Sequence, residues 1–493
     1  MWLSFRTVPK YGISIVLVLE DFTPVLLHSH PLFSWLAKTT SNLFVHQGHS
    51  TFCTSPDGTI IFLLSVDKED LVPERAAKVV GALFMHLNSY RHCAFFVSFL
   101  GEALHPDVLK AIGLAILLRD WNITTYRTSR CEPERFFCQN FLLIHPEAGT
   151  CGKSFQDHRR LARAINWSRD LMNAPSNLLS PKKFIQLLLG LKNIGIVVEV
   201  LDQRQLAQKG FRALLWEAQF TQTAPYVVIL TWKGKKKGSP LDQRPLAFVG
   251  RGASLYSKKK MGEMKMDRAG ASVICGILAN LALRKSSAHV VGVVALVENI
   301  PSKSLKDLDN KVISLSGHTI EVLSTNTDGC LTLADALWYT QNRFNPTAMI
   351  DLATLTDTIG EVLGAEYAGL FSNCDGLADQ LLSAGNKVDE KLWRLPIVKS
   401  FDPVWSDDHT ATQTITYQND GFEAYAAAQF LHRFVNKTPW AHIDISCVTF
   451  FNQDTPRASK GGRAFGLRAL DLWIKNYEKN TSLFNSLFSE MKL

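Results

Sequence analysis

Residues 324–337 are the part of the chain whose residue types most directly suggest chemistry. The stretch runs from Ser324 through Asp328, Gly329 and Cys330 into an apolar segment that ends at Leu337. Because Asn and Asp side chains hydrogen-bond to nearby backbone, its beginning is typical of a loop that opens a helix. Cys330 could act as a nucleophile, but a nucleophilic thiol needs an adjacent base, and the sequence shows none nearby. We therefore interpret Cys330 as a bystander.

A second group of ionisable residues lies in Trp405-Ser406-Asp407-Asp408-His409. The surrounding residues predict a loop, in which short acidic side chains serve as solvated or capping groups. Capping is the preferred interpretation. The alternative is that these side chains fold in and rebuild a site.

A helix predicted over residues 156–172 organises the elements around these groups, because its apolar residues recur on one face. It ends at Asn173-Ala174-Pro175, and Ser180-Pro181 then supplies an N-cap followed by proline at the first helical position. The sequence thus predicts an N-terminal domain over 1–155, a linker helix and turn over 156–180, a larger domain over 181–476 and a peripheral tail over 477–493.

Both domains alternate apolar, β-branched runs with helical segments, which predicts an α/β fold. The smaller N-terminal domain is expected to contain a mostly parallel sheet. The larger C-terminal domain is expected to be a doubly wound mixed sheet flanked by helices, with its site at the carboxyl ends of the strands. In that domain, strands are predicted at 195–201, 226–231, 246–250, 290–297, 348–352 and 441–445, and helices at 181–191, 270–284, 331–340, 375–388, 421–435 and 468–476.

Composition limits the class of protein. A hydrophobic content of 46% and a charged content of 20% are those of a globular chain, and 493 residues are enough for two domains. Nine cysteines without a CxxC pair favour a reducing compartment, so cytoplasmic localisation is expected. No apolar run is long enough for a transmembrane helix. Nucleic acid is not expected as a partner, because the lysine clusters at 233–237 and 258–260 lack interleaved aromatic residues.

The stretch around Asp328 resembles the signature of the leucyl aminopeptidase (cytosol aminopeptidase) family, Asn-Thr-Asp-Ala-Glu-Gly-Arg-Leu followed by Leu-Ala-Asp. Further segments resemble the same family over about residues 160–475. They include Phe248–Gly252, Met264–Asp267, Val297–Ser302, Ser316–Val322, Asp351–Thr356, Trp393–Pro396 and Trp440–Ile445. The resemblance implies a fold with a dinuclear metal site, in which Thr354 and Leu355 line the substrate cleft. Such a site needs several oxygen ligands around two cations ~3.5–4 Å apart.

The first ligand-bearing segment differs from the family at its functional positions. Arg251 stands where the resemblance places a ligand Lys, and an arginine cannot lose its proton to donate a lone pair to a metal. About eight residues, including an Asp-x-Gly-Gly turn, are missing after Gly252. Tyr256 occupies the catalytic Lys position, and a neutral phenol cannot replace an ammonium group. Asp267 remains as one implied ligand.

The second segment retains Asp328 but lacks the bridging Glu, and Cys330 stands at the position of the catalytic Arg. The resemblance therefore leaves Asp267 and Asp328 as a residual, weak metal site and no catalytic side chain. Mn²⁺ or Zn²⁺ is expected if the site survives, and otherwise no tightly bound cofactor.

Three functions follow. The favoured one is a catalytically impaired or inactive leucyl-aminopeptidase-like protein with a structural or regulatory role, as a homo-hexamer or in a mixed oligomer with an active relative. The first alternative is an active metal-dependent aminopeptidase that releases N-terminal amino acids from peptides, its sequence here being a variant that lacks a segment. The second alternative is a nucleic-acid-binding protein.

Overall fold

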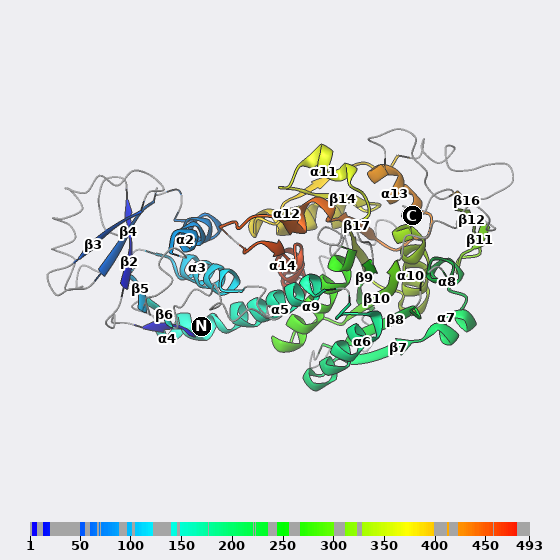
Figure 1. Cartoon of the computed structure of the whole chain (residues 1–493), viewed down its shortest axis with the longest axis horizontal. Coiled ribbons are helices and arrows are strands. Elements are labelled where there is room, and N and C mark those ends of the chain that lie inside the picture. The colour runs from blue at the N-terminus through cyan, green and yellow to red at the C-terminus, as the bar shows by residue number, and fades with distance from the viewer. Residues whose placement is uncertain are drawn as a thin grey trace. The chain divides into compact units, whose positions relative to one another are not determined.

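Figure 1 shows the fold of the chain in a computed structural model. It describes residues 2–6, 13–19, 50–54, 60–66, 69, 71–87, 96–100, 104–121, 140–144, 148–175, 177–219, 221, 223–234, 244–255, 267–299, 311–322, 328–398, 412–413, 423–456 and 458–480. Of these, residues 2–6, 13–19, 50–54, 60–66, 83–87, 96–100, 140–144, 148, 253–255, 299, 328 and 412–413 are described by their backbone.

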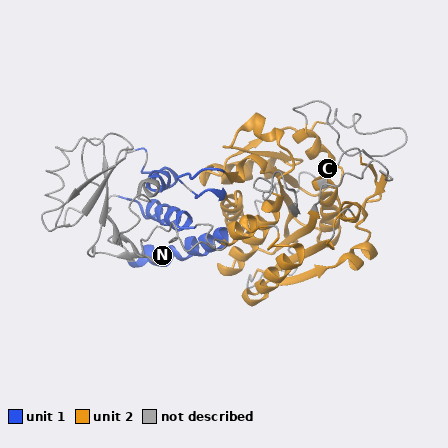
Figure 2. Cartoon of the chain, in the orientation of Figure 1, with its two compact units in different colours: residues 1–166, 452–461 blue, residues 167–451, 462–493 orange. Residues whose placement is uncertain are grey.

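The chain forms two compact units (Figure 2). Unit 1 contains residues 1–166 and 452–461, and unit 2 contains residues 167–451 and 462–493. The division lies within helix α5, Gln156–Asn173, which the sequence assigns to the linker.

Unit 1 contains a six-stranded sheet in the order β1-β6-β5-β2-β4-β3. All neighbouring strands are parallel except β3 and β4, so the prediction of a mostly parallel sheet is confirmed. The strands are β1 Trp2–Arg6, β2 Ile13–Leu19, β3 Ser50–Thr54, β4 Ile60–Val66, β5 Phe96–Leu100 and β6 Asn140–Ile144. Helices α2 Pro73–Leu87, α3 Pro106–Arg119 and α4 Ala148–Ser154 accompany the sheet.

Segment 452–461 is held within unit 1 by a buried arginine. Arg119, at the end of α3, donates from Nη2 to Asp454 Oδ2 over 2.6 Å and from Nη1 to Ser459 Oγ over 2.7 Å. The same segment approaches α2 so closely that a Cβ at Gly81 would lie 1.8 Å from the carbonyl oxygen of Pro456. Glycine is required at position 81 because any side chain would displace this backbone.

Unit 2 is built on an eight-stranded sheet in the order β15-β14-β17-β13-β9-β10-β8-β7. Its central strands β17, β13, β9 and β10 are parallel, while β14 and β8 run antiparallel to their inner neighbours, as expected for a mixed, doubly wound sheet. The strands are β7 Val197–Leu201, β8 Tyr226–Trp232, β9 Leu246–Leu255, β10 Val290–Asn299, β13 Ala348–Ala353, β14 Ala368–Ser372, β15 Leu392–Arg394 and β17 Trp440–Asp444. Shorter strands are β11 Lys311–Ile313, β12 Thr319–Glu321, β16 Thr412–Gln413, β18 Phe450–Phe451 and β19 Gly461–Gly462.

Helices cover both faces of this sheet (Figure 1). Helix α9, Ala269–Leu283, packs on one face and α10, Asp328–Phe344, on the other. Gly250 and Gly292 face α9, where a Cβ on either would come within 3 Å of Ile274. Val249, Val291 and Val293 alternate with them and belong to the core cluster under α10. The period-two alternation of the strands therefore places one layer of core on each side.

The remaining helices complete unit 2. They are α6 Pro181–Leu189, η2 Gly190–Ile194, α7 Gln203–Lys209, α8 Arg212–Ala218, α11 Thr358–Leu363, α12 Asp375–Lys387, α13 Glu423–His432, η8 Ser446–Val448 and α14 Leu467–Lys479. The sequence predicted the long helices α6, α9, α10, α12, α13 and α14, whereas the short α7, α8 and α11 were not predicted.

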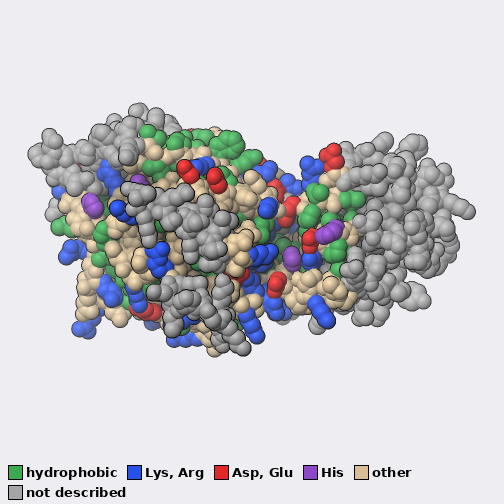
Figure 3. Space-filling view, turned by 180° about the vertical axis from the view of Figure 1, so that it is seen from behind, with side chains coloured by type: hydrophobic (Ala, Val, Ile, Leu, Met, Phe, Trp, Pro, Cys, Tyr) green, Lys and Arg blue, Asp and Glu red, His purple; other side chains and the backbone are tan. Residues whose placement is uncertain are grey.

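Lys and Arg side chains are spread over the face drawn in Figure 3, with hydrophobic, acidic and other side chains between them. None of the helices that the structure describes is both long enough and apolar enough to span a bilayer.

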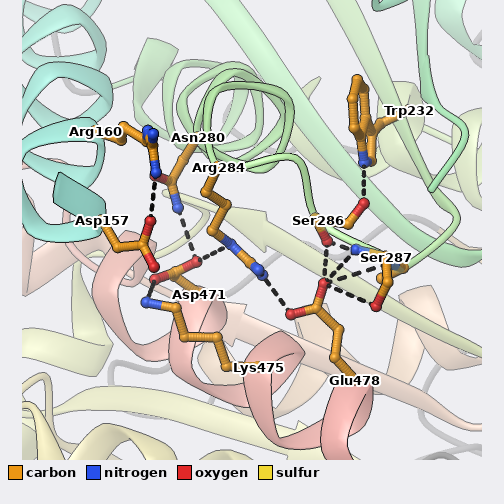
Figure 4. A network of polar contacts seen from close by, with 11 residues as sticks. Asp157, Arg160, Trp232, Asn280, Arg284, Ser286, Ser287, Asp471, Lys475 and Glu478 are labelled. Atoms are coloured by element: carbon orange, nitrogen blue, oxygen red, sulfur yellow. Dashed lines mark hydrogen bonds and ion pairs between the residues drawn. The ribbon is translucent and has the colours of Figure 1, made fainter. Parts of the chain in front are cut away.

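A polar clasp joins the end of α9 to α14 (Figure 4). Arg284 donates from Nε to Asp471 Oδ1 over 3.0 Å and from Nη1 to Glu478 Oε2 over 2.7 Å. Asn280 also donates to Asp471, at 2.8 Å, and Glu478 accepts from the Ser287 backbone N–H at 2.7 Å. The clasp thereby fixes the C-terminal helix on the sheet-covering helix α9.

Candidate functional site

The candidate site lies near the carboxyl end of β9, in the middle of the unit 2 sheet. Strand β9 carries Arg251, and α8 supplies Glu217. Asp267 immediately precedes the first turn of α9, and Thr354 follows β13. Because β9, β10, β13 and β17 are parallel, their carboxyl ends meet at one edge of the sheet, where doubly wound folds place their sites.

Arg251 forms a buried ion pair at this edge. Arg251 is 6% exposed, and its Nη2 donates a hydrogen bond to Glu217 Oε1 over 2.8 Å. Nη1 lies 3.9 Å from Asp267 Oδ2. The other oxygen of Glu217 accepts a hydrogen bond from the Thr332 hydroxyl on α10. A guanidinium stays protonated at any ordinary pH, so this position carries a permanent positive charge.

The Asp267 carboxylate faces Arg251 with one oxygen and accepts a hydrogen bond from the turn after β13 with the other. Thr354 Oγ1 donates to Asp267 Oδ1 at 3.5 Å, and the Asp267 side chain is 22% exposed. Burial raises the pKa of Asp267, whereas the charge of Arg251 opposes that rise. The carboxyl group is thus placed where its ionised form depends on a nearby cation.

Helix α10 approaches Arg251 through its first turn. A Cβ at Gly329 would lie 3.2 Å from Arg251 Nη1 and 2.8 Å from Leu355 Cδ2, so the absence of a side chain leaves space for the guanidinium. The neighbouring Cys330 is 5% exposed, and burial raises the pKa of its thiol to about 12. Cys330 therefore remains a protonated thiol at neutral pH and not a nucleophilic thiolate.

A second buried polar group lies on β13 and β17. His442 Nδ1 is 2.6 Å from Asp351 Oδ1, and Trp440 Nε1 donates to Asp351 Oδ2 over 2.7 Å. Burial alone would lower the pKa of His442, but the charge and hydrogen bond of Asp351 raise it. Asp444 accepts from Thr356 Oγ1 at 2.8 Å, and burial raises its pKa.

The structure brings some of the sequence-predicted residues together. Asp267 and Thr354 are hydrogen-bonded, and Leu355 packs beside Gly329. Asp328 begins α10, but its side chain is not among those described. Tyr256 and the cluster Asp407-Asp408-His409 lie outside the described residues.

Sequence reasoning missed Glu217, Thr332 and the Asp351–His442 pair. The strands Met349-Ile350-Asp351-Leu352 and Ala441-His442-Ile443 carried a usable signal, because an ionisable side chain inside a buried apolar strand needs a partner. Glu217 gave no such signal, since it lies in a short helix whose packing the sequence does not specify.

The described donors do not fit a dinuclear metal centre. Among the described residues, no three His, Cys, Asp or Glu side chains come together in a group that could hold a metal ion. The two carboxylates at the end of β9, Glu217 and Asp267, both face Arg251. One of their two negative charges is therefore compensated by the chain itself.

Comparison with known proteins gives the family. The model of the cytosol aminopeptidase family catalytic domain matches residues 166–471. The chain belongs to the cytosol aminopeptidase family. It is 35% identical over 437 residues to a probable cytosol aminopeptidase of Phytoplasma australiense, covering 86% of this chain and 87% of the relative. It is 34% identical over 478 residues to one of Sinorhizobium fredii, covering 95% and 93%.

A solved structure supports the same fold. A mutant of tomato leucine aminopeptidase superposes with a TM-score of 0.82 at 24% identity, covering 97% of this chain and 96% of that one. At this identity the likeness shows the fold, and the α/β architecture predicted from sequence is confirmed. The family normally uses zinc or manganese.

Proposed function

We propose that this protein is a catalytically impaired or inactive leucyl-aminopeptidase-like protein with a structural or regulatory role in an oligomer. The observation that carries the proposal is the ion pair of Arg251 with Glu217, 2.8 Å apart, beside Asp267. A metal-dependent peptidase uses its cations to polarise the scissile carbonyl and to generate hydroxide from bound water. A guanidinium has no open coordination position and performs neither step.

The site residues of the proposal follow from the resemblance, and the geometry adds the contacts of Asp267, Thr354, Leu355 and Cys330. Asp267 and Asp328 are the residual counterparts of the family's ligands, too few to hold a metal ion tightly, and Thr354 and Leu355 line the remaining cleft. Tyr256 and Cys330 stand at the family's catalytic positions without its catalytic groups. The high pKa of Cys330 supports the exclusion of thiolate catalysis.

The oligomeric role rests on the family. Cytosol aminopeptidases are typically hexameric, and this chain retains the catalytic-domain fold over residues 166–471. We propose a homo-hexamer or a mixed oligomer with an active relative, located in the cytoplasm as the relatives' name indicates.

An active metal-dependent aminopeptidase is the second candidate. It is favoured by the 34–35% identity to relatives described as probable cytosol aminopeptidases and by the retention of Asp267 and Asp328. In that case Mn²⁺ or Zn²⁺ would be the cofactor and peptides the substrates.

Hydrolysis of leucinamide by the full-length chain separates the two candidates. The chain is incubated with Mn²⁺ or Zn²⁺, desalted and assayed beside an active bacterial relative, and its metal content is measured on the same samples. The expected rate is at least about 10³-fold below that of the relative, as for loss of a principal transition-state contact. Loading of two metal ions per chain together with turnover would contradict the proposal.

A further inference from the structure

The charge balance at the end of β9 has a consequence for cation binding, and it rests on the proposed function. Arg251 lies between two carboxylates that come from different elements: Glu217 from α8 and Asp267 from the segment before α9. Two convergent carboxylates are the donor type that divalent cations prefer. Here the position between them is taken by a guanidinium that is covalently part of the chain.

Arg251 and its close partner Glu217 are both buried. The side chains of Arg251 and Glu217 are 7% and 2% exposed. The oxygen of Glu217 that does not face Arg251 accepts the Thr332 hydroxyl, so both oxygens of this carboxylate have a donor. A metal ion that approached Glu217 would therefore meet oxygens that already accept from a guanidinium and a hydroxyl, and it would compete with both donors.

Gly329 is the feature of α10 that accommodates this arrangement. A side chain there would lie 3.2 Å from Arg251 Nη1. The guanidinium therefore reaches the first turn of α10, the same turn in which the chain carries Asp328. A divalent cation between Asp267 and this turn would stand next to a fixed positive charge, which opposes its binding.

We propose that Arg251 is the built-in cation of this site and excludes a divalent metal ion from it, so that removal of the guanidinium creates a cation-binding site. The class of ligand is a hard or borderline divalent cation, with Mn²⁺ as the probe. The unmodified protein then holds a positive charge between its two carboxylates without any cofactor.

The test is a Mn²⁺ titration of the metal-stripped full-length chain, followed by the electron paramagnetic resonance signal of the free ion. For the unmodified chain, no saturable site is expected below about 1 mM Mn²⁺, the weak end of carboxylate affinities. For Arg251→Gln, one saturable site per chain is expected, with a dissociation constant at least about tenfold lower. The double variant R251Q/E217Q is expected to lose that site.

Arg343→Gln is the matched control. Arg343 pairs with Glu199 over 2.6 Å, but both side chains are more than a third exposed in the pair, so its loss frees a solvated carboxylate. R343Q is expected to bind Mn²⁺ no better than the unmodified chain. If R251Q does not fold, Arg251→Met removes the same charge with a side chain suited to buried surroundings and carries the same expectation.

The possible outcomes separate this inference from the proposed function. Saturable micromolar Mn²⁺ binding by the unmodified chain, or equal binding by R251Q and the unmodified chain, overturns the inference even if leucinamide is not hydrolysed. Hydrolysis of leucinamide by a chain without saturable Mn²⁺ binding overturns the proposed function and leaves the inference standing.

Discussion

Two buried arginines of unit 2, Arg284 and Arg251, each face two carboxylates, but they do so in different ways. Arg284 has both acids within 3.0 Å (Figure 4). Asn280 donates to the same Asp471 oxygen as Arg284, Lys475 pairs with the other, and the second oxygen of Glu478 accepts from backbone N–H groups. Arg251 has Glu217 at 2.8 Å but Asp267 at 3.9 Å.

The two arginine clusters lie in different parts of the fold. The Arg284 clasp links α9, which packs on the sheet, to α14, and its carboxylates are engaged by groups of the chain. The Arg251 cluster lies near the carboxyl ends of the parallel strands, where doubly wound folds place their sites, and Asp267 there is 3.9 Å from the guanidinium. A buried ion pair thus joins two helices in one case and, under the proposed function, occupies the position of a cation site in the other.

Removal of Glu217 is expected to have the largest effect on stability. Glu217→Ala removes the close partner of the Arg251 guanidinium, which cannot lose its proton. Breaking a buried ion pair in this way lowers the free energy of unfolding by about 3–5 kcal/mol. A value of about 4 kcal/mol is expected from urea unfolding. Glu217→Gln, which keeps hydrogen-bonding atoms in place, is the control and should cost about half as much. A change below 1 kcal/mol for E217A would show that Arg251 is solvated and does not depend on this pair.

Removal of Asp471 from the clasp is expected to cost less, about 3 kcal/mol, because Arg284 retains Glu478 at 2.7 Å. Urea unfolding of Asp471→Ala measures this value. Lys475→Ala is the matched control, since the Lys475 side chain is 30% exposed and its pair with Asp471 should contribute at most about 1 kcal/mol. If D471A costs more than E217A, the clasp would be the less redundant of the two clusters.

The pH dependence of the clasp is the smallest effect expected. Burial alone would raise the pKa of Glu478, but the hydrogen bond from Ser286 and the charge of Arg284 outweigh it and lower the pKa. A carboxyl group with a lowered folded-state pKa stabilises the protein above its unfolded pKa of about 4.3, and this stability is lost as the pH falls through the folded value.

Glu478→Gln should therefore cost about 2 kcal/mol at pH 7 and progressively less below pH 4.5. Unfolding midpoints of the unmodified chain and of E478Q between pH 3 and pH 8 measure this difference in stability. A difference in stability that stays constant over this range would show that the charge of Glu478 does not stabilise the folded protein.

The sequence predicted the fold well because its strands and long helices are periodic. Helix α5 and strands β8, β9, β10, β13 and β17 lie where apolar periodicity placed them, within a few residues. The family resemblance also drew attention to Arg251, which the structure places on β9.

The partner of Arg251 could not be predicted from sequence. Glu217 is 34 residues away along the chain, in a seven-residue helix that periodicity does not reveal. Its burial depends on how α8 packs on α10, which is a tertiary property. Thr332 likewise acquires its role only once α10 and α8 are in contact.

The central claim is that a guanidinium, and not a metal ion, supplies the positive charge at the end of β9. The most direct measurement is an anomalous difference map from a crystal of the full-length chain soaked in Mn²⁺. The expected result is the Arg251 guanidinium bound to Glu217 beside Asp267, with no manganese peak between Asp267 and Asp328. A manganese peak bridging those two residues, with Arg251 displaced from Glu217, would contradict the account.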